Sequence, residues 1–160
     1  SSAASDVYKR QVIVNRGSKD NVILGMAVLD EKFLVGKVVE VNYSTSRVLL
    51  LSDLNSKIPV SIEPNGVQSI LSGSGSSFGE IQYIKENYEL ENDSEIFTSG
   101  SGGIFRSGIP IGKTIADEDI GFDTIKVKFH SDFSQLRLVK IVSFEEVKKN
   151  DWNFENINFK

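Results

Sequence analysis

The side chains with the most chemical potential lie around His130, the single histidine among 160 residues. Ser131, Asp132 and Ser134 follow it closely, and these residue types make up the catalytic triad of serine hydrolases. A triad needs a nucleophile within hydrogen-bond reach of the imidazole and an oxyanion hole of backbone N–H groups. Nothing in the sequence resembles the glycine-framed serine of two-barrel proteases, so we expect His130 to be a residue at a strand end.

Two glycine-rich runs, residues 73–75 and 100–103, are further candidates because glycine loops cradle phosphate groups. That use requires a helix directly after the loop, and residues 104–110, which end in Pro110, cannot begin a helix. The two runs therefore predict turns between strands. The acidic residues 117–119 lack the spacing of metal ligands, and the chain has no cysteine, so we expect neither a metal nor a cofactor.

A short phrase that occurs twice in the chain predicts two similar β-modules. In each copy two glycines stand eight positions apart, an apolar residue follows the first glycine by five positions, and an apolar strand start follows the second glycine. Glycine supplies a positive φ at a turn, and the apolar residue fills the small core beneath it. The copies are Gly17, Val22 and Gly25, and Gly100, Phe105 and Gly108.

Short β-branched segments, separated by turn residues every eight to twelve positions, predict an all-β fold. We expect two small similar β-barrels packed side by side, with no long helix. Pro59 predicts that its strand lies at a sheet edge, because proline has no N–H to donate to a ladder. The predicted strands span residues 33–41, 46–52, 58–62, 67–72, 78–84, 95–99, 125–129 and 136–142.

The composition excludes some classes of function. A formal net charge of −4 argues against nucleic-acid binding, since neutralising phosphates needs a basic face. Apolar residues make up 39% of the chain, enough to bury one core or two small ones. No apolar run approaches the ~20 residues that cross a bilayer as a helix.

The chain divides into four predicted regions. Residues 1–11 lack strand alternation and are predicted to be a non-native or disordered leader, residues 12–72 the first barrel module and residues 73–143 the second. Residues 144–160 are acidic and rich in asparagine, which favours a frayed tail. The alternative is that the tail docks onto a barrel or a partner through Trp152, Phe154 and Phe159.

Several motifs in the same order give the chain a resemblance to a known family. Residues 14–22, 25–28, 34–38, 46–50 and 58–60 carry it in the first half; residues 98–105, 108–113 and 132–137 carry it in the second. Over residues 12–143 the sequence resembles the bacterial rod shape-determining proteins of the MreC family. Ala27 and Asn21 stand where proline and glycine are common in that family, which loosens one turn without threatening the fold.

The resemblance implies two small β-barrels on the periplasmic side of the cytoplasmic membrane, in a non-enzymatic scaffold for cell-wall elongation. Family members are single-pass membrane proteins with a dimerising coiled coil, so we expect this chain to be the barrel region of a homo-oligomer. The implied partners are a class B penicillin-binding transpeptidase, MreD, RodZ and, through them, the cytoplasmic filament of MreB. A small two-barrel serine hydrolase or ligand-binding module is the alternative.

A scaffold acts through its surface, where buried aromatic or aliphatic anchors and free sheet edges bind partners. The candidate partner-binding residues are Phe33, Ile104, Phe105 and Tyr83. For Ile104 and Phe105 core packing is the favoured alternative, because the repeat places Phe105 opposite Val22. Phe33 lies beside a turn, so we expect its side chain to be exposed and its replacement to leave the melting temperature almost unchanged.

Overall fold

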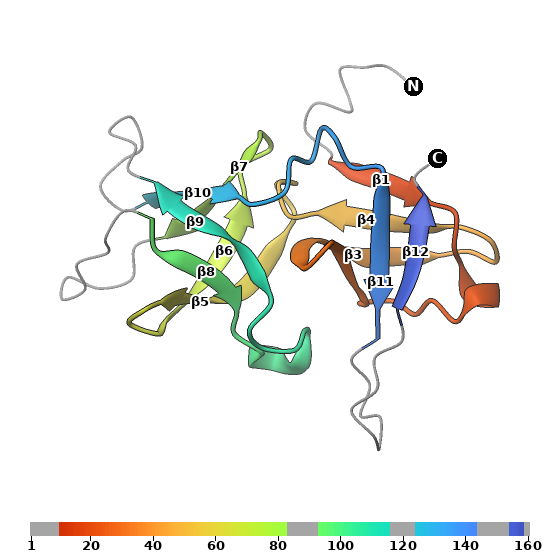
Figure 1. The fold of residues 1–160 in the computed structure, drawn as a ribbon, viewed down its shortest axis with the longest axis horizontal. Helices are drawn as coiled ribbons and strands as arrows, with labels where there is room; N and C mark the ends of the chain where they lie inside the picture. Colours follow the sequence, from red (N-terminus) through yellow and green to blue (C-terminus); the bar gives the residue numbers. More distant parts are fainter. Residues whose placement is uncertain (1–9, 83–92, 116–123, 144–153, 159–160) are drawn as a thin grey trace.

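The computed structural model describes residues 10–82, 93–115 and 124–143, and the backbone of residues 154–158 (Figure 1). The described residues form twelve strands and two 3-10 helices of three residues each, which confirms the all-β prediction. The first seven strands and the first helix are β1 (Gln11–Val14), η1 (Ser18–Asp20), β2 (Ala27–Asp30), β3 (Phe33–Val41), β4 (Ser46–Leu50), β5 (Lys57–Glu63), β6 (Val67–Gly73) and β7 (Phe78–Gln82). The others are β8 (Glu95–Thr98), η2 (Ser101–Gly103), β9 (Pro110–Ile115), β10 (Thr124–Phe129), β11 (Leu138–Val142) and β12 (Phe154–Asn158).

The strands form two lobes that lie side by side (Figure 1). The closed lobe is a six-stranded barrel with the strand order β10-β7-β6-β5-β8-β9. The open lobe is a curled six-stranded sheet with the order β1-β4-β3-β2-β11-β12, so β1 and β12 are its edges. The predicted pair of small β-structures is confirmed, with one barrel closed and the other left open.

The boundary between the lobes does not fall between residues 72 and 73, where the sequence predicted it. β5 and β6 belong to the closed lobe, and residues 74–77 are the hairpin turn between β6 and β7. β11 returns to the open lobe, where it pairs with β2. The modules 12–72 and 73–143 are therefore corrected to a closed lobe inserted between β4 and β11, because pairings between distant strands decide the division.

Both ends of the described chain take part in the open lobe, so the predicted leader ends before Gln11 and part of the predicted tail docks onto a sheet, which was the alternative to fraying; residues 1–9 lie outside the described residues. Gln11, the last residue of the predicted leader 1–11, is the first residue of β1 and pairs with β4. Within the predicted tail 144–160, β12 pairs antiparallel with β11. Backbone hydrogen bonds to a sheet edge are enough to hold such a strand. Trp152 and Phe159 lie outside the described residues.

The repeated phrase is confirmed as a structural repeat. Gly25 and Gly108 both have a φ of 88°. The N–H of Gly25 donates to the carbonyl of Val38 at 2.8 Å, and the N–H of Gly108 donates to the carbonyl of Thr98 at 2.8 Å. Val38 lies on β3, which follows the first copy of the phrase, whereas Thr98 lies on β8, which precedes Gly108. The same local turn therefore occurs in two different strand arrangements. The apolar members of the phrase, Val22 and Phe105, are both buried.

The prediction that the strand containing Pro59 lies at a sheet edge is wrong. β5 pairs with β6 on one side and with β8 on the other inside the closed barrel. The ladder with β8 begins at Val60, one residue after Pro59. The carbonyl of Pro59 still accepts a hydrogen bond from the N–H of Ser99 at 3.2 Å. Pro59 is tolerated because its missing N–H falls at the end of that ladder.

The two lobes share part of their apolar interior. Val28 and Val35 point into the core of the open lobe. Their neighbours Ala27, Leu29 and Leu34 point to the opposite face and pack with the core of the closed lobe. β2 and β3 are therefore buried on both faces, which explains why their sequences are nearly continuous apolar runs instead of alternating ones.

Candidate interaction surface at the junction of the lobes

The turn between β2 and β3 projects from the open lobe and carries the best candidate site. Asp30 pairs with Phe33, so Glu31 and Lys32 form a two-residue loop. Glu31 has a φ of 55°, a left-handed conformation that glycine, asparagine and aspartate adopt more easily than glutamate. Hairpins normally place glycine or asparagine at such positions. Glu31 instead adopts this conformation at a cost in backbone energy.

Phe33 contacts the closed lobe. Its ring lies 5.0 Å from the ring of His130, measured between centroids, with an angle of 39° between the ring planes. The Nε2 atom of His130 lies 2.8 Å from Oε2 of Glu95, which is on β8. The Nζ of Lys32 lies 5.4 Å from the centroid of the Phe33 ring. Phe33 is consequently half-buried at the junction of the lobes, and is not the exposed side chain that its turn position predicted.

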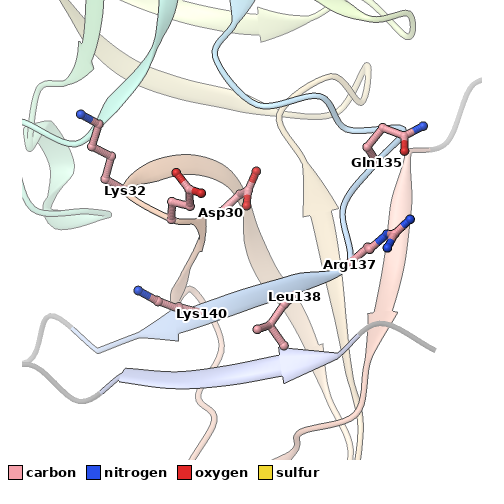
Figure 2. A pocket seen from close by; sticks show the side chains of 7 residues that line it. Asp30, Lys32, Gln135, Arg137, Leu138 and Lys140 are labelled. Atoms are coloured by element: carbon pink, nitrogen blue, oxygen red, sulfur yellow. The ribbon is translucent and has the colours of Figure 1, made fainter.

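A cavity of about 530 Å³ lies beside the same turn (Figure 2). One wall is the β2–β3 turn, and the other is formed by β11 and the segment that leads into it. Figure 2 shows Asp30 between Lys32 and Lys140 on one side and Arg137 and Gln135 on the other. The lining residues are Asp30, Glu31, Lys32, Gln135, Arg137, Leu138 and Lys140.

The cavity combines both signs of charge with one apolar side chain. Asp30 and Glu31 supply carboxylates from the turn, and Arg137 supplies a guanidinium from the opposite wall. In the part of the chain that the structure describes, none of these three forms a salt bridge. Leu138 is 46% exposed. Lys32 adds an ammonium group from the same turn and Lys140 adds one from β11, so the cavity is a surface depression in which the two signs of charge are mixed.

Ile104 and Phe105, two of the other predicted partner-binding residues, do not join Phe33. Ile104 is 38% exposed and follows η2 on the closed lobe. Phe105 is only 6% exposed and belongs to the core of the closed lobe, so its side chain is not available on the surface. Tyr83 lies outside the described residues. Of the three candidates that the structure describes, Phe33 and Ile104 have side-chain surface that a partner can reach.

The geometry around His130 does not form a hydrolase triad. Ser134 donates its hydroxyl to Oδ1 of Asp132 at 2.6 Å, and its backbone N–H to the same atom at 3.0 Å. These hydrogen bonds from Ser134 lower the pKa of Asp132. The imidazole of His130 pairs with Glu95 instead, and no hydroxyl among the described residues is bonded to it. Asp132 and Ser134 therefore form a local turn of their own.

Sequence reasoning missed a contact that ties the start of β1 to the closed lobe. Asp53 is completely buried, and its Oδ2 accepts a hydrogen bond from the backbone N–H of Arg10 at 2.5 Å. Its Oδ1 accepts one from the N–H of Asn55 at 2.8 Å. The Nε of Arg10 donates to the carbonyl of Gly75 at 3.3 Å. From the sequence, Asp53 predicted only a turn, and Arg10 fell within the predicted leader, so neither residue was expected to make this contact.

Neither a candidate metal site nor a membrane-spanning helix is found among the described residues. No group of three or more His, Cys, Asp or Glu side chains in these ranges could hold a metal ion. No helix within them is long and apolar enough to cross a membrane.

The fold and the site define a class of protein: a pair of small β-structures, one closed and one open, that share an apolar junction. Comparison with known proteins gives the family. The family described as "Rod shape-determining protein MreC, barrel core" matches residues 2–143. The chain therefore belongs to the MreC family of rod shape-determining proteins, and the resemblance seen in the sequence is confirmed.

Individual relatives agree with this assignment. The chain is 33% identical to the cell shape-determining protein MreC of Haemophilus influenzae over 144 residues, which cover 88% of this chain and 41% of that protein. It is 29% identical over 153 residues to MreC of Bacillus subtilis, covering 86% of this chain and 53% of that protein. The chain thus spans about half or less of the length of these two relatives.

Solved structures show the same fold. The crystal structure of MreC from Pseudomonas aeruginosa aligns with a TM-score of 0.76 at 29% identity, covering 84% of this chain and 89% of that one. MreC of Helicobacter pylori, solved in a complex with the penicillin-binding protein PBP2, aligns with a TM-score of 0.55 at 19% identity, covering 66% of each chain. The second likeness concerns the fold alone.

Proposed function

We propose that this chain is the barrel region of a non-enzymatic scaffold in the bacterial cell-wall elongation complex. Membership of the MreC family carries the proposal, because the relatives are named as cell shape-determining proteins. The scaffold maintains rod shape by linking peptidoglycan synthases to membrane and cytoskeletal partners. It acts on the periplasmic side of the cytoplasmic membrane, as part of a single-pass membrane protein.

The first partner is a class B penicillin-binding transpeptidase. A protein of the same fold, MreC of Helicobacter pylori, has been solved in complex with PBP2, which supports a partner of this kind. MreD, RodZ and the MreB filament complete the proposed set of partners, and the full-length protein acts as a homo-oligomer. None of these roles needs catalysis, since a scaffold works by holding its partners at fixed positions.

Ile104 and Phe33 are the proposed anchors for the transpeptidase, with Tyr83 as a third candidate. Interfaces depend on a few aromatic or aliphatic side chains that become fully desolvated on binding. Ile104 is a partly exposed apolar side chain just after η2. Phe33 also holds the lobes together through His130, so its contribution to binding has to be separated from its contribution to folding.

Calorimetric titration tests the proposal. The whole chain is titrated with the periplasmic domain of the class B transpeptidase from the same organism, and saturable binding is expected. Ile104→Ser should weaken binding about tenfold, while Ile70→Ser, a matched control that is 47% exposed on β6, should not. Absence of binding in both the monomeric chain and a coiled-coil-fused dimer would contradict the proposed partner. Equal effects of the two substitutions would contradict the proposed anchor.

The alternative of a two-barrel serine hydrolase finds no support in the geometry around His130, because the imidazole faces Glu95 and Phe33. The alternative of a ligand-binding module has one observation in its favour, the charged cavity beside the β2–β3 turn.

A further inference from the structure

The most exposed apolar side chains of the described ranges gather at one end of the open lobe. Tyr43 is 74% exposed and Leu24 63%, the two highest values among the large apolar side chains that the structure describes, and Ile23 is 49% exposed. Ile23 and Leu24 lie in the loop that joins η1 to β2, and Tyr43 lies in the β3–β4 turn. Because β2 and β3 are antiparallel, the start of β2 and the end of β3 lie at the same end of the sheet.

Backbone hydrogen bonds hold the start of this loop against the turn. The N–H of Ser18 donates to the carbonyl of Asn42 at 2.8 Å, and the N–H of Lys19 donates to the carbonyl of Tyr43 at 3.0 Å. A Cβ added at Gly17 would lie 2.2 Å from the carbonyl oxygen of Asn42, so the two segments are in close contact. In Figure 1, η1 and the β3–β4 turn lie at the end of the open lobe that is away from the closed lobe. This end is therefore a separate surface from the junction of the lobes.

The repeated phrase provides an internal comparison for the two exposed aliphatic side chains. Ile23 and Leu24 stand between the buried apolar residue and the second glycine of the first copy. In the second copy, Arg106 and Ser107 take these two positions. The second glycine has a φ of 88° in both copies, so the same turn forms without apolar side chains there. The turn therefore does not require Ile23 and Leu24, and exposed apolar side chains that gather in one place mark an interaction surface.

Positive charge prevails in segment 16–26, although the whole chain has a formal net charge of −4. The segment contains Arg16 and Lys19 but a single acidic residue, Asp20, whose Oδ2 accepts a backbone hydrogen bond at 3.0 Å. On the neighbouring β3–β4 hairpin, Glu40 forms an ion pair with Arg47 at 2.7 Å, so their charges compensate each other. The chemistry of this end, apolar with an excess of cations, is complementary to an anionic lipid surface.

We infer that this end of the open lobe contacts the surface of an anionic bilayer. Leu24 and Ile23 enter the boundary between headgroups and acyl chains, where their burial from water stabilises the contact. Tyr43 and Lys19 lie beside each other, with the Nζ of Lys19 6.0 Å from the centroid of the Tyr43 ring, and occupy the headgroup level that both residue types prefer. Lysine is depleted at protein interfaces, so the presence of Lys19 beside Tyr43 favours lipid over a protein partner.

Co-sedimentation with vesicles tests this inference on the whole chain. One set of vesicles contains equal parts of phosphatidylglycerol and phosphatidylcholine, and the other contains phosphatidylcholine alone. Leu24→Ser should weaken binding to the anionic vesicles about tenfold, since it removes the most exposed aliphatic side chain of the surface. Leu54→Ser is the matched control, because Leu54 is 49% exposed but lies beside Gly75 of the closed lobe.

A second pair of variants tests the charge. Lys19→Gln should weaken binding to the anionic vesicles about fivefold and leave the weaker binding to neutral vesicles unchanged. Lys128→Gln is its control, because it removes one positive charge from an exposed position of β10 in the closed lobe. Melting temperatures are measured for every variant. If Leu24→Ser lowers the melting temperature, Tyr43→Ser replaces it, since Tyr43 is the more exposed side chain.

Binding to anionic vesicles that Leu24→Ser and Lys19→Gln weaken, and that the two controls leave intact, supports the inference. Three results would overturn it: no sedimentation with the anionic vesicles, equal effects of the two leucine substitutions, or no effect of Lys19→Gln. A dimer in sedimentation velocity without lipid, abolished by Leu24→Ser, would also overturn it, because a second copy would then cover the surface. Binding of the transpeptidase is measured without vesicles, so its failure is distinguishable from a failure of lipid binding.

Discussion

The contact between Phe33 and His130 makes the most decisive prediction, because sequence and structure disagree about it. From its turn position, Phe33 should be exposed and dispensable for stability. In the structure its ring lies 5.0 Å from that of His130 across the junction of the lobes. Aromatic pairs at this separation contribute about 0.5–1.5 kcal/mol beyond the area that they bury. We therefore expect Phe33 and His130 to be energetically coupled by about 1 kcal/mol.

The single substitutions should cost more than this coupling. Complete burial of a phenylalanine is worth ~3–5 kcal/mol on truncation to alanine, so half-buried Phe33→Ala should lower the free energy of unfolding by about 2 kcal/mol. His130→Ala removes both the ring contact and the pairing with Glu95. The double-mutant cycle cancels the Glu95 contribution, since that pairing is lost whether or not Phe33 is present.

Denaturant unfolding of the wild type, both single variants and the double variant gives the four free energies. Tyr43→Ala is the control, because its aromatic side chain lies in the same lobe but is 74% exposed, and its loss should change stability by no more than about 0.5 kcal/mol. A coupling below about 0.3 kcal/mol would refute the junction contact. If Phe33→Ala also matched the Tyr43→Ala control, Phe33 would be the free surface residue that the sequence predicted.

Three other expectations follow from the structure. Gly25→Ala and Gly108→Ala should each destabilise the fold by a similar ~1–2 kcal/mol in denaturant unfolding, because both glycines have a φ of 88° and no atom lies within 4 Å of the added methyl group. Asp53→Ala should cost about 2–3 kcal/mol in the same assay, since it leaves two backbone N–H donors without their buried acceptor. Ser134→Ala should raise the pKa of Asp132 back towards its ordinary value of 3.8 in an NMR titration. The stability that a lowered pKa confers is fully present above the unfolded pKa and is lost as the pH falls through the folded pKa, so any effect of Ser134→Ala on stability should fade over that range.

Local patterns predicted the strands well, because a strand's own residues decide whether it alternates or is buried on both faces. The segment predicted at residues 33–41 is β3 with the same bounds, and the serine-glycine run after β6 is the expected hairpin turn. The phrase at Gly25 and Gly108 identified two equivalent turns. Each of these features depends on residues within a few positions of one another.

The order of the strands could not be predicted in this way. β11 lies beside β2 through pairs such as Lys140 with Leu29, which nothing in either segment specifies. Because the closed lobe is inserted between β4 and β11, residues 135–140 return to lie opposite the β2–β3 turn, and this creates the cavity. Phe33 was singled out from its position next to a turn, but the position of His130 against it depends on the packing of two lobes. The sequence therefore predicted one residue of the candidate site, Phe33. The residues around it are brought there by the strand order, which the sequence did not predict.

Within the ranges that the structure describes, three separate sets of contacts join the lobes, and they bear on the proposed scaffold role. Ala27, Leu29 and Leu34 extend the core of the closed lobe into the open one. Phe33 reaches His130, and Asp53 accepts from Arg10 while Arg10 reaches Gly75. Because these contacts come from different parts of the chain, rotating one lobe against the other must break at least one of them. The proposed role, holding synthases and membrane partners at set positions, requires such resistance, since a free hinge between the lobes would let each partner move without the other.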